Sequence, residues 1–135
     1  MFILDTMVVS ERTKSRPDAN VCAWLSALDP QQQFISVISV GEIRFGIDRM
    51  PVGSHKRRLE IWFDELVSFF TGRTLSVDLA VGKRWGRLRH DAGRSVSVSD
   101  ALIGATAHMH NLAVATRNEY LFSDFGLHVI NPWKP

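Results

Sequence analysis

The stretch that decides the fold is Phe2-Ile-Leu-Asp5, an apolar run that ends on an acid near the start of the chain. Two later apolar runs are followed within a turn by Glu42 and Asp100. Open parallel α/β sheets bind their ligands at the carboxyl ends of the strands. If the three runs are strands of one such sheet, the three acids meet at one edge. They would form an oxygen-rich pocket suited to a hard divalent cation.

Short apolar runs alternate with longer segments of helical periodicity along the whole chain. Runs of this kind are typical of strands that are buried on both faces. The expected strands are 2–4, 34–38, 74–77, 112–115 and 128–130. The expected helices are 18–28, 40–49, 56–70, 79–91 and 100–110. The alternation predicts an α/β fold, a three-layer α/β/α domain with a central parallel sheet of about five short strands and right-handed crossovers.

The composition is typical of one globular domain. The chain has 135 residues, of which 45% are hydrophobic and 22% are charged, and a single domain over residues 1–135 is expected at this length. The net charge of +2 is weak evidence for an anionic partner. No apolar stretch approaches the ~20 residues that cross a bilayer, and the N-terminus lacks a signal-peptide pattern. We therefore expect a cytoplasmic protein with no membrane partner.

Each of the three acids also has a purely structural explanation. Ser39-Val-Gly-Glu42 has the spacing of a capping box, Asp100 opens a helix whose dipole favours an acid, and Asp5 could cap the segment after the first strand. As a group they are harder to explain in this way. Two carboxylates ~5 Å apart repel each other by about 3 kcal/mol at an effective dielectric constant near 20. Three together would have to take up protons or hold a cation.

Five segments of the chain resemble the PIN-domain family, and in particular the VapC-like toxins of bacterial toxin–antitoxin pairs. The segments are Phe2-Ile-Leu-Asp5-Thr6, Ser39-Val-Gly-Glu42-Ile43, Ser99-Asp100-Ala-Leu-Ile-Gly-Ala-Thr-Ala107, Ala115-Thr-Arg-Asn118 and Val129-Ile-Asn-Pro-Trp133. They occur in the family's order and span nearly the whole chain.

The resemblance implies an endoribonuclease toxin that depends on Mg²⁺ or Mn²⁺ and cleaves RNA. It also implies a cognate VapB-like antitoxin, through which alone the toxin would contact DNA; a homodimer is expected as well. The family's catalytic positions correspond to Asp5, Glu42, Asp100 and Asn118, and the first three of these would be the metal ligands. Thr6 and Thr116 are expected behind the ligands, where their hydroxyls would orient Asp5 or a metal-associated water.

Positive charge near the acids would be needed to hold RNA. Arg117, beside Asn118, and Arg44, close to Glu42 in the sequence, are the candidates for RNA binding. Both could instead neutralise the acids. Three further cations could extend an RNA-binding rim or form a solvated helix face; they are Lys83, Arg84 and Arg87.

Two positions depart from the family pattern. Met7 stands where family members usually carry asparagine, and Leu121 stands where many carry an aspartate. The pocket is therefore expected to have three carboxylates instead of four, and to hold one divalent ion better than two. A weakly active or non-catalytic PIN binding module is the alternative function.

A heavy aromatic stripe occupies one predicted helix. Its members are Leu59, Trp62, Phe63, Leu66 and Phe70. Such a stripe is typical of a helix face that packs against a sheet. Part of it, with the region around Trp24, could alternatively form an apolar surface for a homodimer or for an antitoxin segment.

Overall fold

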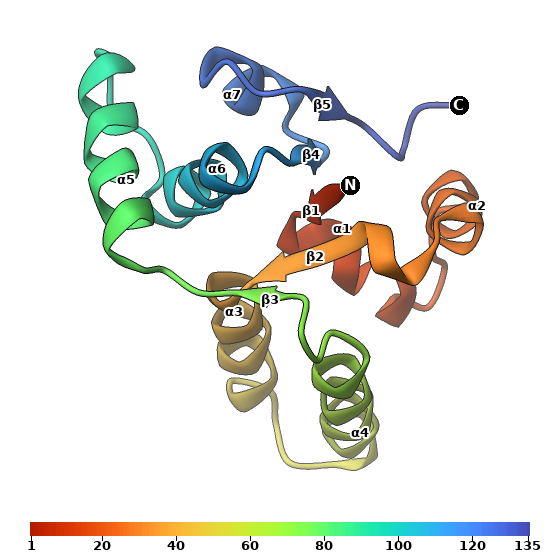
Figure 1. The fold of residues 1–135 in the computed structure, drawn as a ribbon. Coiled ribbons are helices and arrows are strands. Elements are labelled where there is room, and N and C mark those ends of the chain that lie inside the picture. Colours follow the sequence, from red (N-terminus) through yellow and green to blue (C-terminus); the bar gives the residue numbers. More distant parts are fainter.

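Five short parallel strands form the central sheet of the computed structural model, which describes residues 1–135 (Figure 1). The strands are β1 (Phe2–Leu4), β2 (Gln33–Ser36), β3 (Thr74–Leu75), β4 (Ala113–Ala115) and β5 (Val129–Ile130). Their spatial order is β3-β2-β1-β4-β5. Strands β2 and β3 are thus added on one side of β1, and strands β4 and β5 are added on its other side. This reversal is a topological switch point, where parallel sheets bind ligands.

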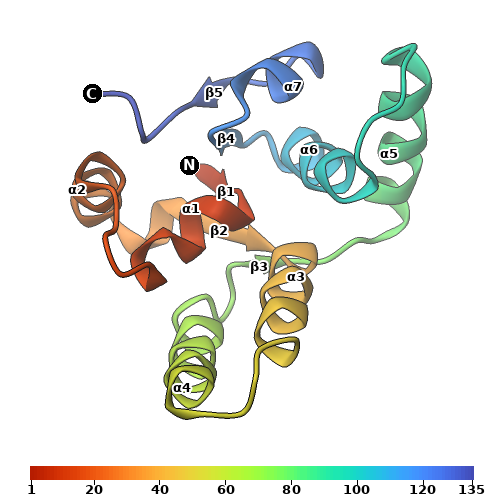
Figure 2. The ribbon, with the colours of Figure 1, turned by 180° about the vertical axis from the view of Figure 1, so that it is seen from behind.

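Helices cover both faces of the sheet. They are α1 (Thr6–Ser10), α2 (Ala19–Ala27), α3 (Val37–Asp48), α4 (Ser54–Phe69), α5 (Leu79–Asp91), α6 (Val98–His110) and α7 (Glu119–Asp124), with short 3-10 turns at Glu11–Thr13 and Pro30–Gln32. Helices α1 to α4 lie on one side and α5 to α7 on the other, as the front and back views show (Figures 1 and 2). The predicted three-layer α/β/α architecture is confirmed.

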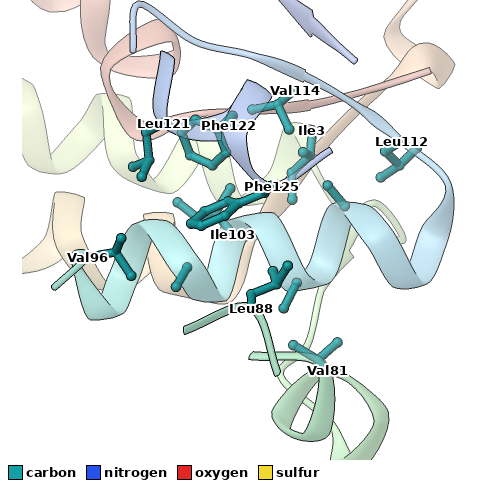
Figure 3. Packing of buried hydrophobic residues seen from close by; sticks show 13 residues of the cluster. Ile3, Val81, Leu88, Val96, Ile103, Leu112, Val114, Leu121, Phe122 and Phe125 are labelled. Atoms are coloured by element: carbon teal, nitrogen blue, oxygen red, sulfur yellow. The ribbon is translucent and has the colours of Figure 1, made fainter. Parts of the chain in front are cut away.

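The sheet separates two hydrophobic cores. Ile3 and Val114 belong to the core on the side of α5 to α7, whereas Leu4 and Ala115 belong to the core on the other side. Successive residues of a strand point to opposite faces, so a strand that is covered on both sides must be apolar throughout. Figure 3 shows the first core, with Ile3 and Val114 above Ile103 of α6.

Two helices next to the predicted site begin earlier than expected. Strand β2 ends at Ser36, and Val37 and Ile38, which were expected in the strand, open α3. The reason is a cap: the Ser36 hydroxyl accepts a hydrogen bond from the Ile38 amide at 3.0 Å. Helix α6 begins at Val98 because Ser97 caps it. The capping-box interpretation of Ser39 and Glu42 is therefore wrong, since both lie inside α3.

Two short helices were not predicted. Helix α1 starts directly after Asp5, whose carboxylate accepts a hydrogen bond from the Thr6 amide, so the expected capping role of Asp5 is confirmed. Helix α7 starts after Asn118, whose side chain makes no cap hydrogen bond. Helices of one or two turns contain too few residues for a periodic pattern.

The aromatic stripe of α4 packs mainly on the sheet. Phe63 and Phe70 are buried, and Leu59, Trp62 and Leu66 are partly buried against the same core. Trp62 and Leu66 also line a hollow of about 500 Å³ that reaches Leu25 of α2. None of the helices combines the length and apolar character that crossing a membrane requires.

Candidate functional site

Three acids from three different elements face a common region at the carboxyl edge of the sheet. Asp5 follows β1, Glu42 lies on α3, which follows β2 directly, and Asp100 lies in the first turn of α6. Burial raises the pKa of Asp100 above its ordinary value, and repulsion from Asp5 and then Glu42 raises it further, against a hydrogen bond from Ser97. The carboxylates therefore interact through their charges, as their positions at the strand ends predicted.

Asp5 is held at the centre of this edge. The register pairs Leu4 with Ala115, so the next residues, Asp5 and Thr116, are neighbours across the strand ends. The Thr116 hydroxyl donates to Asp5 Oδ2 at 2.7 Å, and the Thr6 amide donates to Oδ1 at 2.8 Å. Burial raises the pKa of Asp5, although both hydrogen bonds oppose the shift. Each oxygen keeps a further lone pair that can accept a ligand.

Glu42 is oriented by a chain of hydroxyl groups. The Thr6 hydroxyl lies 2.8 Å from Glu42 Oε1 and 2.8 Å from the hydroxyl of Ser39. Since a hydroxyl has one proton, Thr6 satisfies both contacts by donating to the carboxylate and accepting from Ser39. Ser39 is fully buried. It is a supporting residue that the sequence reasoning missed, because the nearby spacing was interpreted as a cap.

The expectation that Arg44 faces the acids is wrong. Its guanidinium pairs with Asp48 and with Glu60 at 3.6 Å, and it lies 5.3 Å from the centre of the Phe63 ring. Residues two apart on a helix point in different directions, so proximity to Glu42 in the sequence does not place Arg44 near it in space. No ion pair in the structure involves any of the three acids.

Arg117 and Asn118 lie at the rim of the site. The backbone amide of Asn118 donates to the Thr116 hydroxyl at 3.0 Å, and the same hydroxyl donates to Asp5. The Asn118 side chain is exposed. The Arg117 guanidinium stacks over the Trp133 ring at 5.0 Å. It therefore does not neutralise the acids, and its charge remains available at the surface.

The remaining candidate positions add no further carboxylate to the acidic site. Leu121 is buried in the core on the side of α5 to α7, so this position adds an apolar wall and no carboxylate. Met7 is half exposed on α1. The three cations of α5 line a hollow together with Met109, which lies near the C-terminal end of α6; the cations are Lys83, Arg84 and Arg87. Asp100 lies at the opposite end of α6, in its first turn. The three cations do not extend a rim around the acids.

The side-chain atoms of the site that could bind a metal ion are all oxygens, and the only side-chain nitrogen among these residues is the amide nitrogen of Asn118. Carboxylates, hydroxyls and an amide oxygen suit Mg²⁺ and Mn²⁺ better than zinc, which prefers nitrogen and sulfur. No group of three or more Asp, Glu, His or Cys side chains is gathered closely enough to hold a metal ion. The arrangement is thus looser than a closed triad, and water molecules would have to complete any coordination shell.

Comparison with known proteins identifies the family. The model of the PIN domain matches residues 2–126. The chain belongs to the PIN-domain family. This PIN domain is 38% identical to VapC ribonuclease Y4jK of Sinorhizobium fredii, covering 100% of the chain and 99% of the relative. It is 34% identical to Toxin FitB of Neisseria gonorrhoeae, covering 98% of the chain and 99% of that toxin.

A solved structure supports the same relationship. FitAB bound to an IR36 DNA fragment superposes on this PIN domain with a TM-score of 0.96 at 33% identity, and the match covers 100% of this chain and 97% of the other. The similarity to named toxins therefore extends over the full length of the chain, in sequence and in fold.

Proposed function

We propose that this PIN domain is a metal-dependent endoribonuclease toxin that hydrolyses RNA phosphodiester bonds with Mg²⁺ or Mn²⁺. One observation carries the proposal: Asp5, Glu42 and Asp100 converge at the switch point of the sheet, and two of them have raised pKa values. No protein cation pairs with them, so their repulsion favours a bound cation. The similarity to a relative named as a ribonuclease supports this chemistry.

Asp5 and Asp100 would hold the ion, and Glu42 would bind it directly or through a water molecule. The residues fit such an ion because they supply oxygen donors only. Mg²⁺ is usually bound through one or two carboxylates and keeps several of its waters, so the open spacing of these acids is compatible with it. Because residue 121 is a buried leucine and not an acid, a single bound ion is favoured over two.

Each residue has a separate task in the proposed reaction. When bound, the cation would neutralise charge on the attacked phosphate and lower the pKa of a water molecule. Thr116 and Thr6 keep the Asp5 carboxylate in one orientation. Glu42 is exposed and only its Oε1 is held, which leaves Oε2 to orient the attacking water. The resemblance to the family implies products with a 5′-phosphate and a 3′-hydroxyl.

We also propose that a VapB-like antitoxin silences this toxin and supplies its contact with DNA. Toxin FitB is a close relative over its full length, and the solved FitAB assembly is bound to DNA. The hollow between α2 and α4 has a volume of about 500 Å³ and is lined in part by Leu25, Trp62 and Leu66. We propose that an apolar segment of the antitoxin occupies it. A homodimer remains a prediction, which light scattering of the isolated chain and of Trp62→Glu would test.

Cleavage assays on labelled RNA test the enzymatic proposal. Wild type, Asp5→Asn and Asp100→Asn are compared in Mn²⁺, in Mg²⁺ and in EDTA. We expect cleavage that requires the cation and falls at least about 100-fold in both variants. Asp64→Asn is the matched control, since Asp64 is an exposed acid on α4, and it should cleave like wild type. Equal cleavage by all four proteins would contradict the proposal.

The apolar character of positions 7 and 121 favours one second candidate, a PIN module that binds metal or a partner but cuts poorly. Leu121 stands where many family members carry an aspartate and is buried in the core on the side of α5 to α7, so it supplies no fourth carboxylate. Binding of Mn²⁺ without cleavage of any RNA would support this module over the enzyme.

A further inference from the structure

An exposed aromatic side chain lies four residues after Thr116, the residue that donates to Asp5. Tyr120 is the only tyrosine of the chain, lies in the first turn of α7 and is 81% exposed. It lines a hollow of about 470 Å³, whose other residues are Arg117, Asn118, Glu119 and Ser123. Single exposed apolar residues are common on protein surfaces. Tyr120 differs from them because it borders a polar hollow that is physically linked to the proposed metal ligands.

The link is a short chain of hydrogen bonds. Asp5 accepts from the Thr116 hydroxyl at 2.7 Å, and the same hydroxyl accepts from the Asn118 amide at 3.0 Å. Helix α7 begins at the next residue. The backbone that carries Tyr120 is therefore anchored to the residue that holds Asp5, so the start of α7 keeps a fixed relation to the acidic site.

The charges in the hollow favour an anion. The guanidinium of Arg117 is supported from one side by the Trp133 ring at 5.0 Å and forms no ion pair. The ion-pair partner of Glu119 is Lys134 and not Arg117: Lys134 Nζ lies 2.7 Å from Glu119 Oε2, and the Asn131 side-chain amide donates to the same oxygen at 3.1 Å. One available cation thus lies beside one available aromatic ring.

We propose that Tyr120 and Arg117 form a subsite for one unpaired nucleotide of the RNA next to the scissile phosphate. Tyr120 stacks on the base, and Arg117 contacts the phosphate. This inference rests on the proposed ribonuclease function and adds which side chains hold the nucleotide; the ring of Tyr120 can reach the face of an unpaired base, whereas the faces of a paired base are covered by its neighbours. Every base has a π-face, so the subsite tolerates different bases.

The polar character of the hollow distinguishes this occupant from a protein segment. Only one of the five residues that line it is hydrophobic, whereas the hollow between α2 and α4 is lined mainly by hydrophobic residues, 8 of 13. A polar recess with one ring and one guanidinium matches a nucleotide, which combines an aromatic base with a charged phosphate.

Binding of single-stranded RNA tests the subsite. Fluorescence anisotropy in Mg²⁺ would measure the Kd of a labelled 10-nucleotide RNA. The full chain would carry Asp100→Asn in every protein, so that the RNA is not cleaved during the measurement. Tyr120→Ala should weaken binding roughly 5- to 150-fold, the range for one stacked base, and Tyr120→Phe should retain binding. Ile61→Ala, which removes a 61% exposed side chain of α4, is the matched control and should not change the Kd.

Abasic substitutions identify the stacked base. Moving one abasic site along the RNA should weaken binding at a single position, and Tyr120→Ala should abolish that position's effect. Arg117→Gln should lower the slope of log Kd against log salt concentration by about 0.7, the value for one phosphate contact to a single strand.

Failure of the subsite and failure of the enzyme give different results. If wild type cleaves RNA and Tyr120→Ala binds and cleaves it equally well, the subsite proposal is wrong. If that variant in addition binds the antitoxin more weakly than wild type does, Tyr120 is a protein-contact residue. If wild type neither binds nor cleaves RNA, the ribonuclease proposal and the subsite both fall.

Discussion

One buried hydroxyl connects the parts of the acidic site. Thr116 is fully buried, donates to the Asp5 carboxylate and accepts from the Asn118 amide. It therefore joins the end of β1 to the turn after β4. Removing this hydroxyl would leave a buried carboxylate oxygen without its donor, which costs more than the net value of an ordinary hydrogen bond.

Thr116→Val should lower the free energy of unfolding by about 1–3 kcal/mol. It should also raise the pKa of Asp5 further, because the hydrogen bond that favours the charged form is lost. Urea unfolding and Mn²⁺ titration calorimetry between pH 5 and 8 measure the two effects, and Mn²⁺ binding should require a higher pH. Thr106→Val is the control: Thr106 is equally buried but donates to the Leu102 carbonyl within α6. An identical pH profile for both variants would refute the assignment.

The charge of Asp100 is expected to destabilise the metal-free protein. Its raised pKa means that the folded state binds more protons than the unfolded state once the pH exceeds the unfolded value of about 3.9. Stability therefore falls as the pH rises from the unfolded value through the folded pKa, and the penalty is complete above the folded pKa. Asp100→Asn should remove this penalty.

In EDTA at pH 7, Asp100→Asn should raise the free energy of unfolding by up to about 1 kcal/mol, since partial exposure screens the repulsion. The gain should vanish as the pH approaches 3.9. Urea unfolding at several pH values provides the measurement, with the exposed Asp64→Asn as a control that shows no gain. A variant that is less stable than wild type at pH 7 would show that Asp100 serves α6 mainly as a structural residue.

Close packing positions α6 beneath the turn after α7. A Cβ atom added at Gly104 would lie 2.8 Å from Cδ2 of Phe125, and Figure 3 shows the Phe125 ring lying over α6. Both the helix that carries Asp100 and the segment that carries Tyr120 meet at this contact. The absence of a side chain at Gly104 thus determines how closely the two elements approach.

Gly104→Ala should lower the free energy of unfolding by about 1–3 kcal/mol through overpacking, although alanine is favoured over glycine in a helix by about 1 kcal/mol. Gly86→Ala in α5 is the matched control, because a Cβ there meets nothing within 4 Å. It should stabilise the protein by up to about 1 kcal/mol. Thermal unfolding of both variants measures the difference, and a stabilised Gly104→Ala would contradict the packing argument.

The acidic site joins the two layers of helices. Asp5 follows the central strand, Glu42 belongs to the layer of α1 to α4, and Asp100 belongs to the layer of α5 to α7. A cation bound between them would connect elements that otherwise contact each other mainly through the sheet. Metal binding should therefore stabilise the molecule as a whole.

Mn²⁺ at 100 times its Kd should stabilise the folded protein by about 2.7 kcal/mol, which raises the Tm by several degrees, and EDTA should reverse the shift. Asp5→Asn and Asp100→Asn should lose most of it, whereas Asp64→Asn should keep it. Differential scanning calorimetry measures the Tm of each protein. Equal shifts in all of them would place the ion elsewhere on the surface.

Local pattern in the sequence was sufficient for the order of the five strands and the five longer helices, and for the parallel three-layer fold, but not for the short helices α1 and α7. Alternation of apolar runs and helical periods is a local property, and the two covered faces of the sheet account for the continuous apolar strands. The grouping of Asp5, Glu42 and Asp100 was predictable because the carboxyl ends of parallel strands share one edge.

Only the tertiary structure decided which side chains meet at that edge. Arg44 pairs with Asp48 and Glu60 instead of the acids, and Ser39 supports Thr6 instead of capping a helix. Likewise, the exposure of Tyr120 beside Arg117 depends on where α7 packs. Side-chain direction depends on contacts between residues far apart in the chain, and periodicity within one segment carries no information about those contacts.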